Sequence, residues 1–206
     1  MLSTFPHLTE SEYEDACHCF LRQFQQRGHE QTGWLSVETV HQNDIAYLRV
    51  TKELSAREDC LMGGCSELED DEVQEDDGEV LRATITPRAT IHYDMILSPV
   101  YRVPVLYISI SDPLHRYPPT MSTLYEHLVP PEFKAQTENV GIIGGITITD
   151  HPATNRPVFF IHPCQTAEVM EASAGKSNVT TKEYLMVWIG ALGKCVGLNV
   201  PLVLAR

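Results

Sequence analysis

Residues 158–164, Val-Phe-Phe-Ile-His-Pro-Cys, form a short apolar run that ends in a cysteine. A run of this length, aromatic and β-branched and closed by Pro163, predicts a buried strand that ends at about Ile161. Residues 100–109, VYRVPVLYIS, give the strongest strand signal in the chain, and Pro104 within them predicts an edge position or a bulge. The two segments predict a sheet with Cys164 just past the end of one strand.

The rest of the chain adds helices and a hairpin to this sheet. Thr9 and Glu12 form a T-x-x-E capping box, which predicts a helix over 9–26. Two strands, Trp34–Val40 and Asp44–Leu54, predict a hairpin with a turn near residue 42. Further predicted elements are one or two strands within 80–97, a short helix near 120–128 capped by Thr120 or Ser122, and a last helix capped by Thr180 and Glu183. The order predicts an α+β fold, an antiparallel meander sheet with helices packed on one side.

The length and charge predict a single domain over residues 1–206 with a flexible acidic loop at about 55–79. Nine of the 28 acidic residues lie in Glu67–Glu79, so the formal net charge of −13 is concentrated there. The remaining 19 acids and 15 bases leave no basic surface, which argues against nucleic acid as a partner. No long apolar run or signal peptide is present, so we expect a cytoplasmic protein without stable membrane insertion.

The six cysteines are expected to be reduced, because a chain of this size builds a core without disulfides. Cys17 and Cys195 fall on the apolar faces of predicted helices and are expected in the core. Neither Cys17 with Cys19 nor Cys60 with Cys65 has a spacing suited to zinc, and we expect no metal. The glycine-rich residues 140–145 lack a phosphate-binding pattern, so no cofactor is expected.

Cys164 is the cysteine that neither a helix face nor a loop explains. Pro163 fixes the backbone before it, and a short helix starting near Gln165 would favour a thiolate at its N-terminus. A buried structural cysteine at a strand end is an equally good interpretation of the spacing. His162, two residues away along an extended segment, is expected to point to the opposite face and to organise the backbone rather than act as a base. A cysteine protease would pair Cys164 with a separate histidine as its base. The candidates are His92, His115, His127 and His151, and none lies in a recognisable protease motif.

The segment FFIHPC, preceded by Asp150-His151-Pro152, resembles the active-site signature of the autophagy E2-like conjugating enzymes. The strand Tyr101-x-x-Pro104-x-Leu106-Tyr107 is similar to a second signature of that family. The resemblance implies an E2-like core and a thioester on Cys164, which nucleophilic catalysis passes to an amine. It leaves the oxyanion donor open among His162, backbone N–H groups near Gln165, and the hydroxyl of Tyr93 or Tyr101. For both tyrosines, a core ring with its hydroxyl at the surface is the simpler interpretation.

The family has a branch that modifies a protein lysine and a branch that modifies a lipid. The tail at 196–202 and the short chain resemble the protein-conjugating branch, whereas residues 167–170 and the acidic insert resemble the other. The first branch implies as partners an E1-like enzyme (autophagy-related protein seven), a modifier (autophagy-related protein twelve) and a target (autophagy-related protein five). It also implies that the hairpin at 34–54 grips the target by strand addition. We favour the protein-conjugating branch. The lipid-conjugating branch and a non-catalytic E2-like binding module stay open as alternatives, and a monomer recruited to the autophagosome formation site is expected.

Overall fold

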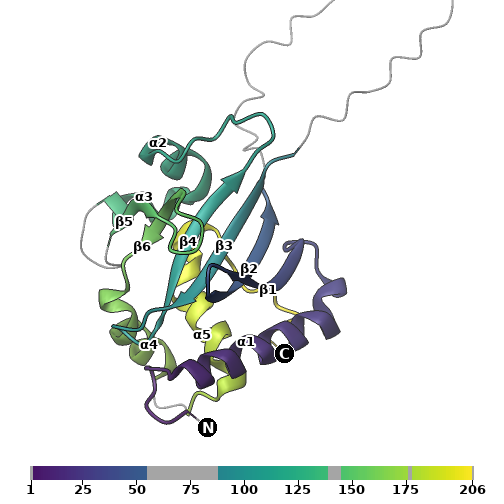
Figure 1. Cartoon of the computed structure of the whole chain (residues 1–206), viewed down its shortest axis with the longest axis vertical. Helices are drawn as coiled ribbons and strands as arrows, with labels where there is room; N and C mark the ends of the chain where they lie inside the picture. The colour runs from purple at the N-terminus through teal and green to yellow at the C-terminus, as the bar shows by residue number, and fades with distance from the viewer. Residues whose placement is uncertain (1, 55–87, 139–144, 176–177, 206) are drawn as a thin grey trace, which may run out of the picture.

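The computed structural model describes residues 2–54, 88–138, 145–175 and 178–205. Its centre is a six-stranded antiparallel sheet in the order β1-β2-β3-β4-β6-β5, with helices gathered on one side (Figure 1). The predicted acidic loop at 55–79 and most of the glycine-rich stretch lie outside the described residues. The α+β class and the antiparallel meander with helices on one side are confirmed. The strands are β1 (Ser36–Gln42), β2 (Ile45–Glu53), β3 (Thr90–Leu97), β4 (Pro104–Ser111), β5 (Ile146–Asp150) and β6 (Pro157–Ile161).

The predicted hairpin is confirmed as β1 and β2, which pair antiparallel from Ser36 with Thr51 to Gln42 with Ile45. Asn43 and Asp44 make the turn with φ values of 50° and 62°. Two successive residues of positive φ form a tight turn whose twist matches that of the strands, and Asn and Asp tolerate this conformation. β1 lies at one edge of the sheet, as strand addition to the hairpin requires.

The prediction that Pro104 marks an edge or a bulge is wrong. Pro104 is the first residue of β4, paired with Leu97, and β4 lies in the interior of the sheet between β3 and β6. A proline is tolerated at the first position of a strand because the ladder there does not need its N–H. In the predicted strand region 80–97, the described part forms one strand, β3.

The long helices cover one face of the sheet. Both predicted capping boxes are present, Thr9 with Glu12 on α1 and Thr180 with Glu183 on α5. The core between these helices and the sheet holds Cys17 and Cys195, as expected, together with Phe20 and Trp188. Within the described ranges, no helix is both long enough and apolar enough to cross a membrane. The helices are α1 (Glu10–Arg27), α2 (Met121–Thr123), α3 (Pro131–Glu138), α4 (Thr166–Ala174) and α5 (Thr181–Leu192), with 3₁₀ turns η1 (Gly28–Glu30), η4 (Pro163–Gln165) and η5 (Gly193–Val196) and the π-turn η3 (Leu124–Leu128).

The predicted short helix near 120–128 is present as α2 followed by η3. Thr120 is its N-cap and accepts a hydrogen bond from the backbone of Thr123. Leu124 and Leu128, the apolar positions of this segment, are buried in the main core.

The other face of the sheet carries a small second core of Tyr47, Ile96 and Ala153. Ala153 belongs to the turn between β5 and β6, so this turn folds over the face that the helices leave uncovered.

Candidate functional site

Cys164 lies immediately after β6, where the chain leaves the sheet. His162 is the first residue after the strand, Pro163 begins the 3₁₀ turn η4, and α4 follows from Thr166. The thiol is free and Cys164 is exposed, so the buried structural cysteine considered above is excluded. The predicted short helix after the cysteine is present, and its N-terminus favours negative charge close by.

The side chain of His162 contacts the backbone of Cys164. The Cys164 N–H donates to Nδ1 of His162 at 3.2 Å. The extended segment assumed between the two residues is wrong, because Pro163–Gln165 form a 3₁₀ turn. An Nδ1 atom that accepts this bond carries no proton, so the proton of the neutral ring is on Nε2.

Two aromatic rings pack in T-shaped contacts with the imidazole of His162. Tyr101 lies 5.7 Å from it between ring centroids at 80°, and Phe160 lies at 5.9 Å and 86°. Edge-to-face packing of this kind restricts the rotation of the imidazole. Tyr101 is 39% exposed, and its turn is fixed by His7, whose Nδ1 lies 3.1 Å from the Tyr101 carbonyl oxygen. The structure therefore brings Tyr101, His162 and Cys164 together.

Tyr93 is not part of this cluster. It is 1% exposed, and its hydroxyl donates to the carbonyl of Val196 at 2.8 Å in the main core. Burial raises the pKa of Tyr93 well above its ordinary value. A hydroxyl occupied in this way is not available to a thioester at Cys164, so Tyr93 is not an oxyanion donor. The prediction that the Tyr93 hydroxyl lies at the surface is also wrong.

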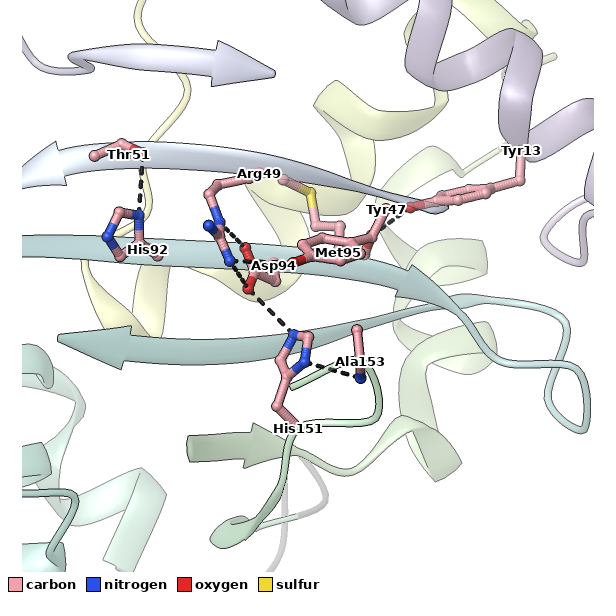
Figure 2. Close-up of polar contacts among 9 residues, drawn as sticks. All are labelled: Tyr13, Tyr47, Arg49, Thr51, His92, Asp94, Met95, His151 and Ala153. Atoms are coloured by element: carbon pink, nitrogen blue, oxygen red, sulfur yellow. Dashed lines mark hydrogen bonds and ion pairs between the residues drawn. The ribbon is translucent and has the colours of Figure 1, made fainter. Parts of the chain in front are cut away.

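His151 forms a polar network that sequence reasoning did not predict (Figure 2). Its Nε2 lies 3.2 Å from Oδ2 of Asp94, and its Nδ1 accepts the N–H of Ala153 at 3.1 Å. Arg49 donates two hydrogen bonds to the same carboxylate, at 2.6 and 2.7 Å. Burial alone raises the pKa of Asp94, but the bonds from Arg49 and His151 outweigh it and hold the pKa below its ordinary value.

The network anchors the β5–β6 turn to the sheet. His151 is 2% exposed, its Nδ1 accepts the Ala153 N–H and its Nε2 faces the Asp94 carboxylate, so it is not placed to serve as a base for the exposed Cys164. Arg49 and Asp94 are directly paired across β2 and β3, a relationship that depends on the strand register. One indication of this network is present in the sequence, which is that Asp150-His151-Pro152 precedes the active-site segment.

The thiols of Cys17 and Cys195 differ from that of Cys164 by their burial. Burial raises the pKa of Cys17 to about 12 and that of Cys195 to about 11. Both thiols are therefore protonated at neutral pH and shielded from reagents. Among the residues that the structure describes, no group of three His, Cys, Asp or Glu side chains is placed to hold a metal ion.

Residues 12–203 match the sequence profile of the family described as "Autophagocytosis associated protein, active-site domain". The chain belongs to this family. The resemblance that the FFIHPC segment suggested is thereby confirmed, and the family match includes every residue of the Cys164 site except His7.

Relatives in this family carry the name "Ubiquitin-like-conjugating enzyme ATG10". The one from Gibberella zeae is 35% identical over 133 residues, 64% of this chain and 55% of the relative. The one from Homo sapiens is 33% identical over 138 residues, 64% of this chain and 60% of the relative. The chain thus spans between about half and three fifths of the length of these relatives.

A solved structure titled "Crystal structure of Autophagic E2, Atg10" also resembles this chain. It covers 91% of this chain and 97% of its own length, at 13% sequence identity and a TM-score of 0.44.

Proposed function

We propose that this protein is an E2-like enzyme of autophagy that carries a ubiquitin-like modifier as a thioester on Cys164 and transfers it to a lysine. The observation that carries the proposal is the exposed, free thiol of Cys164 in a 3₁₀ turn at the start of α4. Membership of the active-site family supports it.

The proposed reaction has two steps. In the first, the Cys164 thiolate attacks the carbonyl carbon of the modifier's C-terminal glycine, which is bound as a thioester to an E1-like enzyme. The E1 thiolate leaves, and the new thioester is on Cys164. In the second, a lysine amine attacks the same carbon, an amide bond forms, the amine loses a proton and the Cys164 thiolate is released.

His162 is proposed as the organiser of this turn. Its Nδ1 already accepts the Cys164 N–H, so that nitrogen cannot take a proton from the thiol. The same bond occupies the Cys164 N–H, which removes it from the set of free oxyanion donors. Tyr101, in edge contact with His162 and partly exposed, is proposed to hold the ring in place.

We propose autophagy-related proteins seven, twelve and five as the E1-like enzyme, the modifier and the target. The name of the relatives, which belongs to the protein-conjugating branch, supports this set. The proposal includes a single E2-like domain over 1–206 that works as a monomer in the cytoplasm. β1, at the edge of the sheet, is proposed as the strand that contacts the target.

The test is a reconstituted transfer with the E1-like enzyme, ATP and the modifier. Wild type is expected to form an adduct that reductant cleaves, Cys164→Ser an adduct that reductant does not cleave, and Cys19→Ser, the matched control, the wild-type adduct. Adding either the target protein or vesicles with an amino phospholipid then decides between the branches. With an E1-like enzyme shown to be active, absence of any adduct would favour a binding module.

A further inference from the structure

β5 is an edge strand that leads away from the Cys164 site. Among the described residues it pairs with β6 alone, from Ile146 with Ile161 to Asp150 with Pro157. Figure 1 shows it beside β6 at the opposite edge from β1. The five pairs run without a bulge, and its sequence, Ile-Thr-Ile-Thr-Asp, has neither Lys nor Pro. Proteins commonly protect an exposed edge with such features, so this edge is suited to accept another strand.

The direction of β5 determines where an added strand would end. β6 runs antiparallel to β5, and its last residue, Ile161, lies opposite Ile146. A strand added antiparallel to β5 would run in the direction of β6 and end at the same end of the sheet. Cys164 lies three residues beyond Ile161, so the C-terminus of the added strand would end close to the thiol.

We infer that the outer edge of β5 binds the extended C-terminal tail of the ubiquitin-like modifier as an additional antiparallel strand. This inference rests on the proposed function, which requires a C-terminal glycine at Cys164. A peptide that must deliver its last residue to a thiol has to be extended near that end. Pairing of its backbone with β5 would hold it so, without dependence on a particular side chain.

The backbone bonds around β5 indicate which residues would bind the tail. The N–H of His162 donates to the Gly145 carbonyl at 3.5 Å, and the N–H of His151 donates to the Arg156 carbonyl at 2.8 Å. Hydrogen-bonded pairs alternate along an antiparallel ladder, so the odd-numbered residues of β5 bond to β6. The N–H and C=O groups of the even-numbered residues, Ile148 at the centre, therefore point to the open edge.

The side chain of Ile148 supports the same surface. It is 39% exposed, whereas Ile146 at the start of the strand is 6% exposed. An aliphatic residue of the tail beside Ile148 would cover this apolar area.

Ile148→Pro tests the inference because proline removes an N–H that the β5–β6 ladder does not use. Proline is tolerated on edge strands, and Thr147 before it already has the extended conformation that a following proline favours. Thr149→Pro is the matched variant, because it removes an N–H directed at β6. We expect Thr149→Pro to lower the melting temperature and Ile148→Pro to leave it unchanged. Ile148→Val keeps the N–H and is expected to behave as wild type.

The first measurement is single-turnover discharge of the preformed Cys164 thioester to a lysine acceptor. Loss of one backbone hydrogen bond to the tail is expected to slow Ile148→Pro by about two- to tenfold relative to Ile148→Val. The second measurement uses the wild-type protein and a synthetic peptide of the modifier's tail that ends in glycine. The peptide is expected to slow amide exchange at Ile148 and to leave Thr147 unchanged.

The outcomes separate this inference from the proposed function. If wild type forms no reductant-sensitive adduct with an active E1-like enzyme, the proposed function is overturned and this inference with it. If the adduct forms but Ile148→Pro discharges as fast as Ile148→Val, and the peptide leaves Ile148 exchange unchanged, the β5 inference alone is overturned. Should Ile148→Pro fail to fold, the wild-type exchange measurement decides.

Discussion

The backbone N–H of Cys164 and the Nδ1 atom of His162 are joined by a 3.2 Å hydrogen bond across a single proline. The bond closes the turn between β6 and α4 and fixes the direction in which the chain presents the cysteine. Because Nδ1 is the acceptor, the histidine acts on the backbone and not on the thiol. The site thus differs from a cysteine protease, in which a histidine takes the proton of the nucleophile.

Replacement of His162 tests this role. His162→Asn offers a short side-chain oxygen that can accept the N–H two residues ahead, so we expect thioester formation close to wild type. His162→Leu offers no acceptor and is expected to form the thioester about two- to tenfold more slowly, as the loss of one hydrogen bond predicts. The initial rate of adduct formation measures both. A histidine that serves as a base would make the two variants equally slow.

Tyr93→Phe separates stability from activity. Removal of the hydroxyl leaves the buried Val196 carbonyl without its partner, which is expected to lower the free energy of unfolding by about 1–2 kcal/mol. Transfer by the folded protein is expected to be unchanged. Denaturant unfolding and single-turnover transfer measure the two effects. A transfer rate reduced tenfold or more in fully folded Tyr93→Phe would restore Tyr93 as a catalytic candidate.

Asp94→Asn tests the network that anchors the β5–β6 turn. It leaves Arg49 without a charged partner in a site where the carboxylate is 3% exposed, and we expect a loss of about 2–4 kcal/mol in the free energy of unfolding. The control is Glu53→Gln, which breaks a surface pair with Arg88 and is expected to cost less than about 1 kcal/mol. Equal losses in the two variants would show that the network adds no stability.

The pH dependence of stability follows from the same carboxylate. Because the pKa of Asp94 is below its ordinary value of 3.8 in the folded protein, the unfolded chain binds the proton more tightly. Its contribution to stability is therefore complete above about pH 5 and is lost as the pH falls through the folded pKa. The stability of Asp94→Asn is expected to fall less steeply below pH 4 than that of wild type, as urea unfolding at several pH values would show.

The reactivity of the cysteines is expected to follow their exposure. At pH 8, iodoacetamide is expected to modify Cys164 while Cys17 and Cys195, whose pKa values burial raises, stay unmodified in the native protein. Peptide mass spectrometry after short exposure measures the order, and labelling after unfolding is the control. Modification of Cys17 as fast as Cys164 would contradict the burial of Cys17 on the inner face of α1.

Local patterns predicted most of the individual elements. Both capping boxes, the β1–β2 hairpin and the short strand before Cys164 depend on residues close together in the sequence. Helical spacing also predicts Cys17 and Cys195 in the core, where both lie, although Cys195 belongs to the 3₁₀ turn η5 beyond the end of α5. One error concerns strand order, since Pro104 lies in an interior strand, and another concerns the site. The pattern predicts an extended segment between His162 and Cys164, whereas Pro163 begins a 3₁₀ turn that brings the His162 ring to the Cys164 backbone N–H. A periodicity of two cannot anticipate such a turn at the end of a strand.

The sequence by itself determined the fold class, the family and the cysteine on which the proposed chemistry depends, because these follow from spacing and from contiguous motifs. The tertiary structure alone decided that Tyr101 contacts His162, that Tyr93 lies in the core, and that Asp94 joins Arg49 to His151. It also decided that β5, and not only β1, forms an edge of the sheet. Such relationships join residues up to 103 positions apart, and the packing of the elements with their strand order and register sets them.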